Sequence, residues 1–162
     1  MANIERKFLA HFINATPSST ATYERLGKDL EELNIEMNPE VEEKKNILGE
    51  NSIKISSYAP QSSVEPFYAD DGTDLHAFLQ EIIDNRAVLD DLKTDVVEVQ
   101  LWEETGNNTG VYKAFKDKVF IEISSYGGDT TGYQIPFNVH YTGERTEGTF
   151  NLSTKTFTAT TP

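Results

Sequence analysis

Residues 30–58 read LEELNIEMNPEVEEKKNILGENSIKISSY, and this stretch decides the fold class. Its first half alternates apolar with acidic or amide side chains: Leu33, Ile35, Met37 and Val41 against Glu32, Asn34, Glu36, Asn38, Glu40 and Glu42. A period of two predicts a strand with one apolar face and one polar face. Pro39 cannot donate a hydrogen bond to a neighbouring strand, so we expect an edge or a bend there.

The second half of the stretch predicts a partner strand. Residues 52–58 form another extended run, in which Ile53 and Ile55 fall on one face. Residues 44–51 connect the two runs. Two strands with this connection predict a long hairpin arm, residues 39–58, that projects from the body of the domain.

A helix is predicted over residues 74–86. It follows the turn of residues 70–73, and Thr73 or Asp74 can accept hydrogen bonds from the free N–H groups of its first turn. Five apolar residues recur with helical spacing: Leu75, Phe78, Leu79, Ile82 and Ile83. This stripe predicts that one side of the helix packs against a core.

The rest of the chain has the pattern of β-structure. Extended runs are predicted at residues 7–14, 23–26, 95–104, 119–123, 133–142, 149–152 and 156–160, with turns at 105–110, 126–129 and 142–145. The sequence shows no repeat, linker or low-complexity tract, so we expect one domain, residues 1–162. Many short strands with one helix predict a mainly β fold of the sandwich or partial-barrel kind.

Charge and composition exclude several classes of partner and site. The formal net charge is −13, and residues 65–104 alone hold 12 acids and 2 bases. This charge repels phosphate backbones and anionic lipids, so we expect no specific DNA binding and no membrane partner. No run approaches the ~20 apolar residues that span a bilayer, and the first residues carry no secretion signal, so we expect synthesis in a cytoplasm. The absence of cysteine excludes disulfides and thiolate metal sites.

The motifs that suggest chemistry are weak. The glycines of residues 127–132 resemble a phosphate-binding loop, but no Lys-Ser or Lys-Thr pair follows, and a hairpin turn explains them better. Residues 70–74 resemble a calcium loop, but the EF-hand frame places phenylalanines at two ligand positions. His11, His76 and His140 lack metal-ligand spacing. We therefore expect no catalytic residue, metal site or cofactor, and a protein that is not an enzyme.

Two segments, residues 30–50 and 127–141, resemble the major tail tube proteins of long-tailed, siphovirus-like bacteriophages and prophages. The order of elements is also similar: early strands, a long arm, one helix after an acidic turn, then β-hairpins. The resemblance implies a β-sandwich or half-barrel with a flanking helix. It also implies hexameric rings that stack into a virion tail tube, whose acidic lumen conducts DNA without binding it specifically. Its implied partners are further copies of itself and the tail terminator, tape measure and baseplate proteins.

This resemblance suggests two sets of site residues. The candidate lumen-lining residues are the polar side of the early strand, namely Glu32, Asn34, Glu36, Asn38, Glu40 and Glu42. The candidate inter-ring contacts are the middle of the arm, namely Lys44, Lys45, Ile47, Leu48, Gly49 and Glu50. For the first set, an ordinary solvated strand face is an equally good interpretation.

A second function stays open. Trp102, Tyr112 and Tyr126 have aromatic faces that can stack on sugar rings, although such residues also serve core packing. The alternative is therefore a carbohydrate-binding β-sandwich module of a phage baseplate or a surface assembly.

Overall fold

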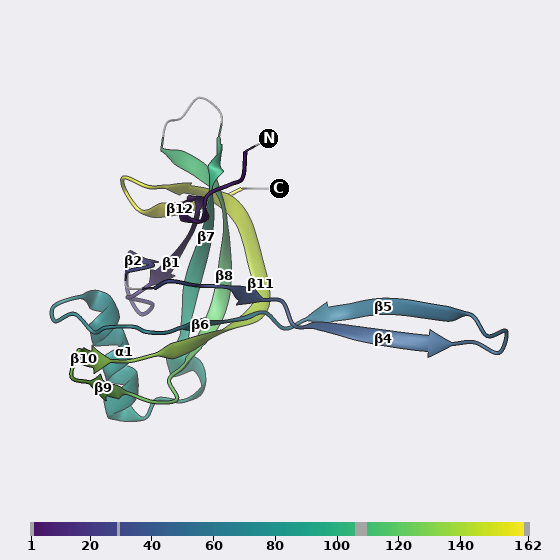
Figure 1. The fold of residues 1–162 in the computed structure, drawn as a ribbon. Helices are drawn as coiled ribbons and strands as arrows, with labels where there is room; N and C mark the ends of the chain where they lie inside the picture. Colours follow the sequence, from purple (N-terminus) through teal and green to yellow (C-terminus); the bar gives the residue numbers. More distant parts are fainter. Residues whose placement is uncertain (1, 29, 106–109, 161–162) are drawn as a thin grey trace.

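The computed structural model describes residues 2–28, 30–105 and 110–160, and it is mainly β with one α-helix, as predicted (Figure 1). The predicted turn at 105–110 falls mostly outside these residues. The strands are β1 (Leu9–Asn14), β2 (Tyr23–Leu26), β3 (Ile35–Glu36), β4 (Pro39–Lys45), β5 (Asn51–Tyr58), β6 (Gln61–Val64), β7 (Lys93–Glu104), β8 (Val111–Glu122), β9 (Gly127–Asp129), β10 (Gly132–Gln134), β11 (Phe137–Asn151) and β12 (Thr156–Ala159). The helix is α1 (Asp74–Asn85), and short 3-10 turns, η1 and η2, cover Arg6–Phe8 and Leu89–Leu92.

One open antiparallel sheet organises the body. Its eight strands follow the order β2-β1-β7-β8-β11-β6-β3, and β12 pairs with β11 off this path. The pairs β9–β10 and β4–β5 form separate two-stranded sheets. The glycine-rich residues 127–132 therefore form part of a β-hairpin, as the sequence predicted.

The predicted helix is confirmed as α1. The hydroxyl of Thr73 accepts a hydrogen bond from the backbone N–H of His76 at 3.3 Å, and the helix ends at Arg86 in the left-handed conformation (φ 50°). Its stripe is buried at Leu75, Leu79, Ile82 and Ile83. These side chains join Ile13, Val96, Val119, Ile121 and Phe137 in the larger hydrophobic core.

A second core lies on the other face of the sheet, which the sequence pattern did not show. Val96 belongs to the helix-side core and its neighbour Val97 to the second core, and both are fully buried. Because adjacent strand residues point to opposite faces, β7 is covered on both sides here. Phe12 and Phe150 meet in the second core, with ring centroids 4.6 Å apart.

Several predicted boundaries are wrong. Most of the predicted turn at 126–129 is strand β9, and the predicted run 133–142 is divided between β10 and β11. Residues 142–145 are not a hairpin turn, because β11 continues through them with a register shift between Tyr141 and Arg145. Gly143 (φ 95°) lies inside this irregularity and bends the strand without ending it. The early alternation is not one strand either. Asn38 adopts a left-handed conformation (φ 47°), and this separates β3 from β4, which starts at Pro39.

The hairpin β4–β5 continues the edge of the sheet outward. At the edge, β3 pairs with β6 through Glu36 and Gln61, and beyond the Asn38 kink Pro39 pairs with Tyr58 in the same register. The kink is held by two hydrogen bonds, from Ala59 N–H to the Met37 carbonyl at 3.1 Å and from the Asn38 amide to the Ala59 carbonyl at 3.0 Å. We call residues 39–58 the arm; Figure 1 shows it extending away from the body.

Candidate functional site

Every residue of the two arm strands is exposed. Val41 pairs with Ile55, and Ile53 lies two residues from Ile55, so these three apolar side chains share one face of the arm. Their exposed fractions are 57%, 52% and 72%, respectively. A two-stranded ribbon by itself is at best marginally stable in water. The arm therefore has an apolar face that its own body leaves uncovered.

The tip of the arm, residues 46–50, is a defined loop. The side-chain oxygen of Asn46 accepts hydrogen bonds from the backbone N–H groups of Leu48 at 2.9 Å and Glu50 at 3.0 Å. Gly49 supplies the positive φ (81°) that closes the loop. Ile47 and Leu48 consequently point outward, with exposed fractions of 102% and 77%.

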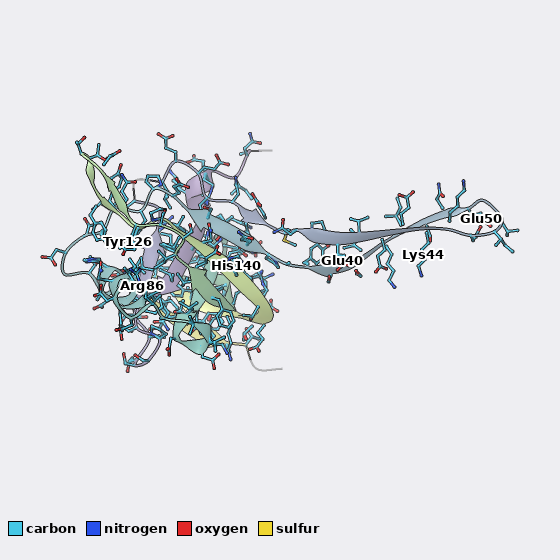
Figure 2. All side chains as sticks on the ribbon, turned by 90° about the horizontal axis from the view of Figure 1, so that it is seen from below. Glu40, Lys44, Glu50, Arg86, Tyr126 and His140 are labelled. Carbon is cyan, nitrogen blue, oxygen red and sulfur yellow. The ribbon has the colours of Figure 1, made fainter. Side chains whose placement is uncertain are left out.

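The structure brings the candidate inter-ring residues together at the outer end of the arm. Lys44 and Lys45 end β4, and the other four, Ile47, Leu48, Gly49 and Glu50, lie in the tip. Figure 2 shows Glu40, Lys44 and Glu50 spaced along the arm toward this end. All six are exposed.

The candidate lumen residues are all exposed, but they do not share one strand. Glu32, Asn34 and Glu36 lie on the body, where the Asn34 amide donates to the Glu32 carboxylate. Asn38 forms the kink. Glu40 and Glu42 lie on the arm. The apolar face expected behind the early part of this set, namely Leu33, Ile35 and Met37, is also wrong in part, since Leu33 is buried but Met37 is exposed.

A groove lies between the C-terminal end of α1, η2 and the segment after β8, and sequence reasoning missed it. It has a volume of ≈ 840 Å³, and its lining includes Ile82, Leu89, Leu92, Ile121, Ile123 and Tyr126. We call it the α1–β8 groove. Arg86 donates a hydrogen bond to the Tyr126 hydroxyl at 3.2 Å and lies over its ring, 5.7 Å from the centroid. Because three separate segments build the groove, no local pattern could reveal it.

A network of ionisable side chains crosses the helix-side face of the sheet, and it was also missed. His11 contacts one carboxylate oxygen of Glu98 at 3.2 Å, and Arg145 contacts the other at 2.7 Å. The second Arg145 nitrogen lies 3.7 Å from Asp117. Hydrogen bonding to His11 and Arg145 lowers the pKa of Glu98 to about 2, whereas burial, opposed by Arg145, raises the pKa of Asp117 to about 6.

We expect Asp117→Asn to stabilise the protein at pH 7.5 but not at pH 4. A raised native pKa means that ionising Asp117 costs stability, and this cost appears as pH rises from about 4 to above 6. Two pKa units correspond to at most about 3 kcal/mol. Urea unfolding at both pH values measures the effect. Glu98→Gln is the control and should have the opposite effect at pH 7.5. The lowered pKa of Glu98 adds stability above about pH 4.5, and this variant loses that stability. An equal gain for Asp117→Asn at both pH values would contradict the assignment.

The three candidate sugar-stacking residues do not form one platform. Trp102 lies in the last part of β7 and Tyr112 at the start of β8, whereas Tyr126 lies beyond the other end of β8 against Arg86. They therefore occupy two separate places on the molecule.

The histidines are likewise dispersed. His76 lies edge-on to Tyr133 with centroids 6.1 Å apart, and His140 contacts Glu122 at 3.1 Å. Within residues 2–28, 30–105 and 110–160, no three acidic or histidine side chains gather as a metal site would require. Over the same part of the chain, no helix is long and apolar enough to cross a bilayer.

No protein-family model matches the sequence, and no curated protein matches it at a significant level.

Proposed function

We propose that this chain is a structural subunit of a phage tail tube, with a half-barrel body whose hexameric rings stack through the arm. The observation that carries the proposal is the fully exposed arm with an apolar face and an apolar tip. In the described residues, fourteen large apolar side chains are exposed, and six of them belong to the arm: Val41, Ile47, Leu48, Ile53, Ile55 and Tyr58. An apolar concentration of this kind marks a surface that a partner covers.

The shape of the arm suits a contact between stacked subunits. The eight residues of β5 reach roughly 26 Å at 3.3 Å per residue, so the tip contacts a surface far from its own core. A contact between two different surfaces of identical subunits is heterologous, and such contacts close into rings or extend into filaments. The net charge of −13 fits a conduit that releases DNA, since each cation along the path would add attraction to phosphate.

Electron microscopy of the purified protein at increasing concentration tests the proposal. Rings or tubes are the expected result. Monomers at all concentrations, together with measurable glycan binding, would favour the carbohydrate-binding alternative.

The lumen assignment leads to a separate prediction. Replacing Glu32 and Glu36 by Lys should leave tube formation intact, because both side chains are exposed, but should slow or stall genome ejection. Added cations attract the passing phosphates in a salt-dependent way. The measurement is DNA release from virions that carry the variant. Glu103→Lys with Glu104→Lys is the matched control, with the same charge change at the end of β7. Parental ejection rates for the Glu32 and Glu36 variant would remove these residues from the lumen.

A further inference from the structure

One face of the arm carries an acid and a base among its uncovered apolar side chains. Val41, Glu43 and Lys45 alternate along β4, so they point to the same side of the arm. Val41 pairs with Ile55 and Glu43 pairs with Ile53, which adds two isoleucines from β5 to that side. We call these five residues the arm face. It presents three aliphatic side chains, one carboxylate and one ammonium group to solvent.

Charge makes the arm the part of this protein that a second copy approaches most easily. The arm, residues 39–58, contains four acids and three bases, a net charge of −1. The rest of the chain contains 23 acids and 11 bases, a net charge of −12. Figure 1 shows the arm extending away from the body, so two arms can meet while the two acidic bodies stay apart. At 0.1 M salt, repulsion between the bodies is screened beyond about 10 Å.

Glu43 and Lys45 favour one orientation of two arm faces. In an antiparallel pair, a two-fold axis at the level of the Lys44–Ser52 pair places β4 over β4, and Glu43 of each copy then lies over Lys45 of the other. Packed sheets lie about 10 Å apart, a distance that a glutamate and a lysine side chain span together. A parallel two-fold pair would instead place Glu43 over Ile53, which leaves each charge without an opposite charge.

The same antiparallel register joins the apolar parts of the two arms. Val41 lies three positions inward from the axis and Ile47 three positions outward, so Val41 of each copy reaches the level of the other copy's tip. Ile53 lies one position from the axis, so the two copies of Ile53 meet beside it. These three side chains are 57%, 102% and 72% exposed in the single chain. Removing them from water favours the pair.

We propose that the free protein forms a two-fold dimer by antiparallel pairing of its arm faces. This inference goes beyond the proposed tail tube, because it concerns the arm before assembly. A contact of roughly 26 Å by 10 Å from each copy buries about 500 Å² in total, below the ~1,200–2,000 Å² of a stable interface. The pair is therefore weak and reversible. A two-fold contact closes at two copies, so the arms separate again before they stack.

Sedimentation velocity of the full chain, at increasing concentrations below the onset of tubes, measures this pair. The parent is expected to dimerise. Lys45→Glu replaces two ion pairs with two like-charge contacts, so the Kd of the dimer should rise at least about tenfold. Lys44→Glu is the matched control, since it makes the same charge change on the opposite face of β4. Its Kd should stay within about threefold of the parental value.

Complementary variants test the orientation. Glu43→Lys should weaken the dimer as Lys45→Glu does, and a mixture of the two variants should recover it, because each supplies the charge that the other lacks. The double variant Glu43→Lys with Lys45→Glu should dimerise like the parent but should not pair with the parent. A parent that stays monomeric would overturn the arm pair. Equal losses for Lys44→Glu and Lys45→Glu, or a mixture without recovery, would also overturn it.

Electron microscopy of the same samples keeps this inference separate from the proposed function. Tubes from a parent that never dimerises would overturn the arm pair and leave the tube function standing. Dimers without tubes at any higher concentration would support the arm pair and contradict the tube. A parent that forms neither dimers nor tubes would overturn both.

Discussion

Deleting residues 46–51 is expected to abolish tube formation and to leave the fold of the body intact. The deletion removes the whole apolar tip, whereas the two hydrophobic cores contain no arm residue. Electron microscopy should show no tubes at concentrations where the parent assembles. The melting temperature should stay within about 2 °C of the parental value, because exposed positions contribute little to stability.

A second variant tests the side chains of the tip without changing the length of the arm. Replacing Ile47 and Leu48 by Ser keeps the loop, since Asn46 and Gly49 remain. If the apolar tip makes the contact, this variant also loses assembly. Parental tubes from the deletion variant would show that the arm is not the assembly element.

Leu79→Ala is expected to destabilise the protein by ~2–5 kcal/mol, because truncating a large buried side chain leaves a cavity. Leu79 is fully buried in the core between α1 and the sheet. For a chain of this size the loss corresponds to a fall in melting temperature of roughly 4–20 °C. Calorimetry or thermal circular dichroism measures it.

Glu81→Ala is the matched control on the exposed side of the same helix. It should change stability by less than about 0.5 kcal/mol. An unchanged melting temperature for Leu79→Ala would mean that the helix presents a different face to the sheet.

The sequence predicts the local elements well where one face of an element is buried. The stripe of α1 has the helical spacing of Leu75, Leu79 and Ile82, and one side of the helix is covered. The same logic fails at β7, where Thr94 and Val96 are buried on one face and Val97 and Val99 on the other. Alternation reports burial on one side only, so it cannot reveal a strand covered on both.

Backbone conformation caused the boundary errors at residue 38 and at residues 142–145. Asn38 and Gly143 both adopt positive φ, yet the first separates β3 from β4 and the second lies within a continuous β11. The type of the residue with positive φ does not determine whether the strand ends there or only bends. Pairing with β8 on both sides of the irregularity keeps β11 whole.

The candidate surfaces differ in how far the sequence could predict them. The tip residues are contiguous, and the resemblance of residues 30–50 to tail tube proteins was enough to suggest them as contacts. The network around Glu98 joins β1, β7, β8 and β11, and its His11 contact spans 87 residues of sequence. Such sites depend on strand order and register, which one sequence without its fold does not give.

The arm can act as a mechanical lever, because at its base, up to Glu40, it keeps the register of the β3–β6 pair at the sheet edge. Its fulcrum is the pair of hydrogen bonds between Met37, Asn38 and Ala59. With an arm of roughly 26 Å, a rotation of about 10° at the fulcrum moves the tip by about 4–5 Å. Small changes of twist at β6 are thus magnified at the tip. In the proposed stacked assembly, the torsion at this fulcrum would set the distance and the rotation from one ring to the next, so a tube would bend or straighten by adjusting a few residues in each subunit.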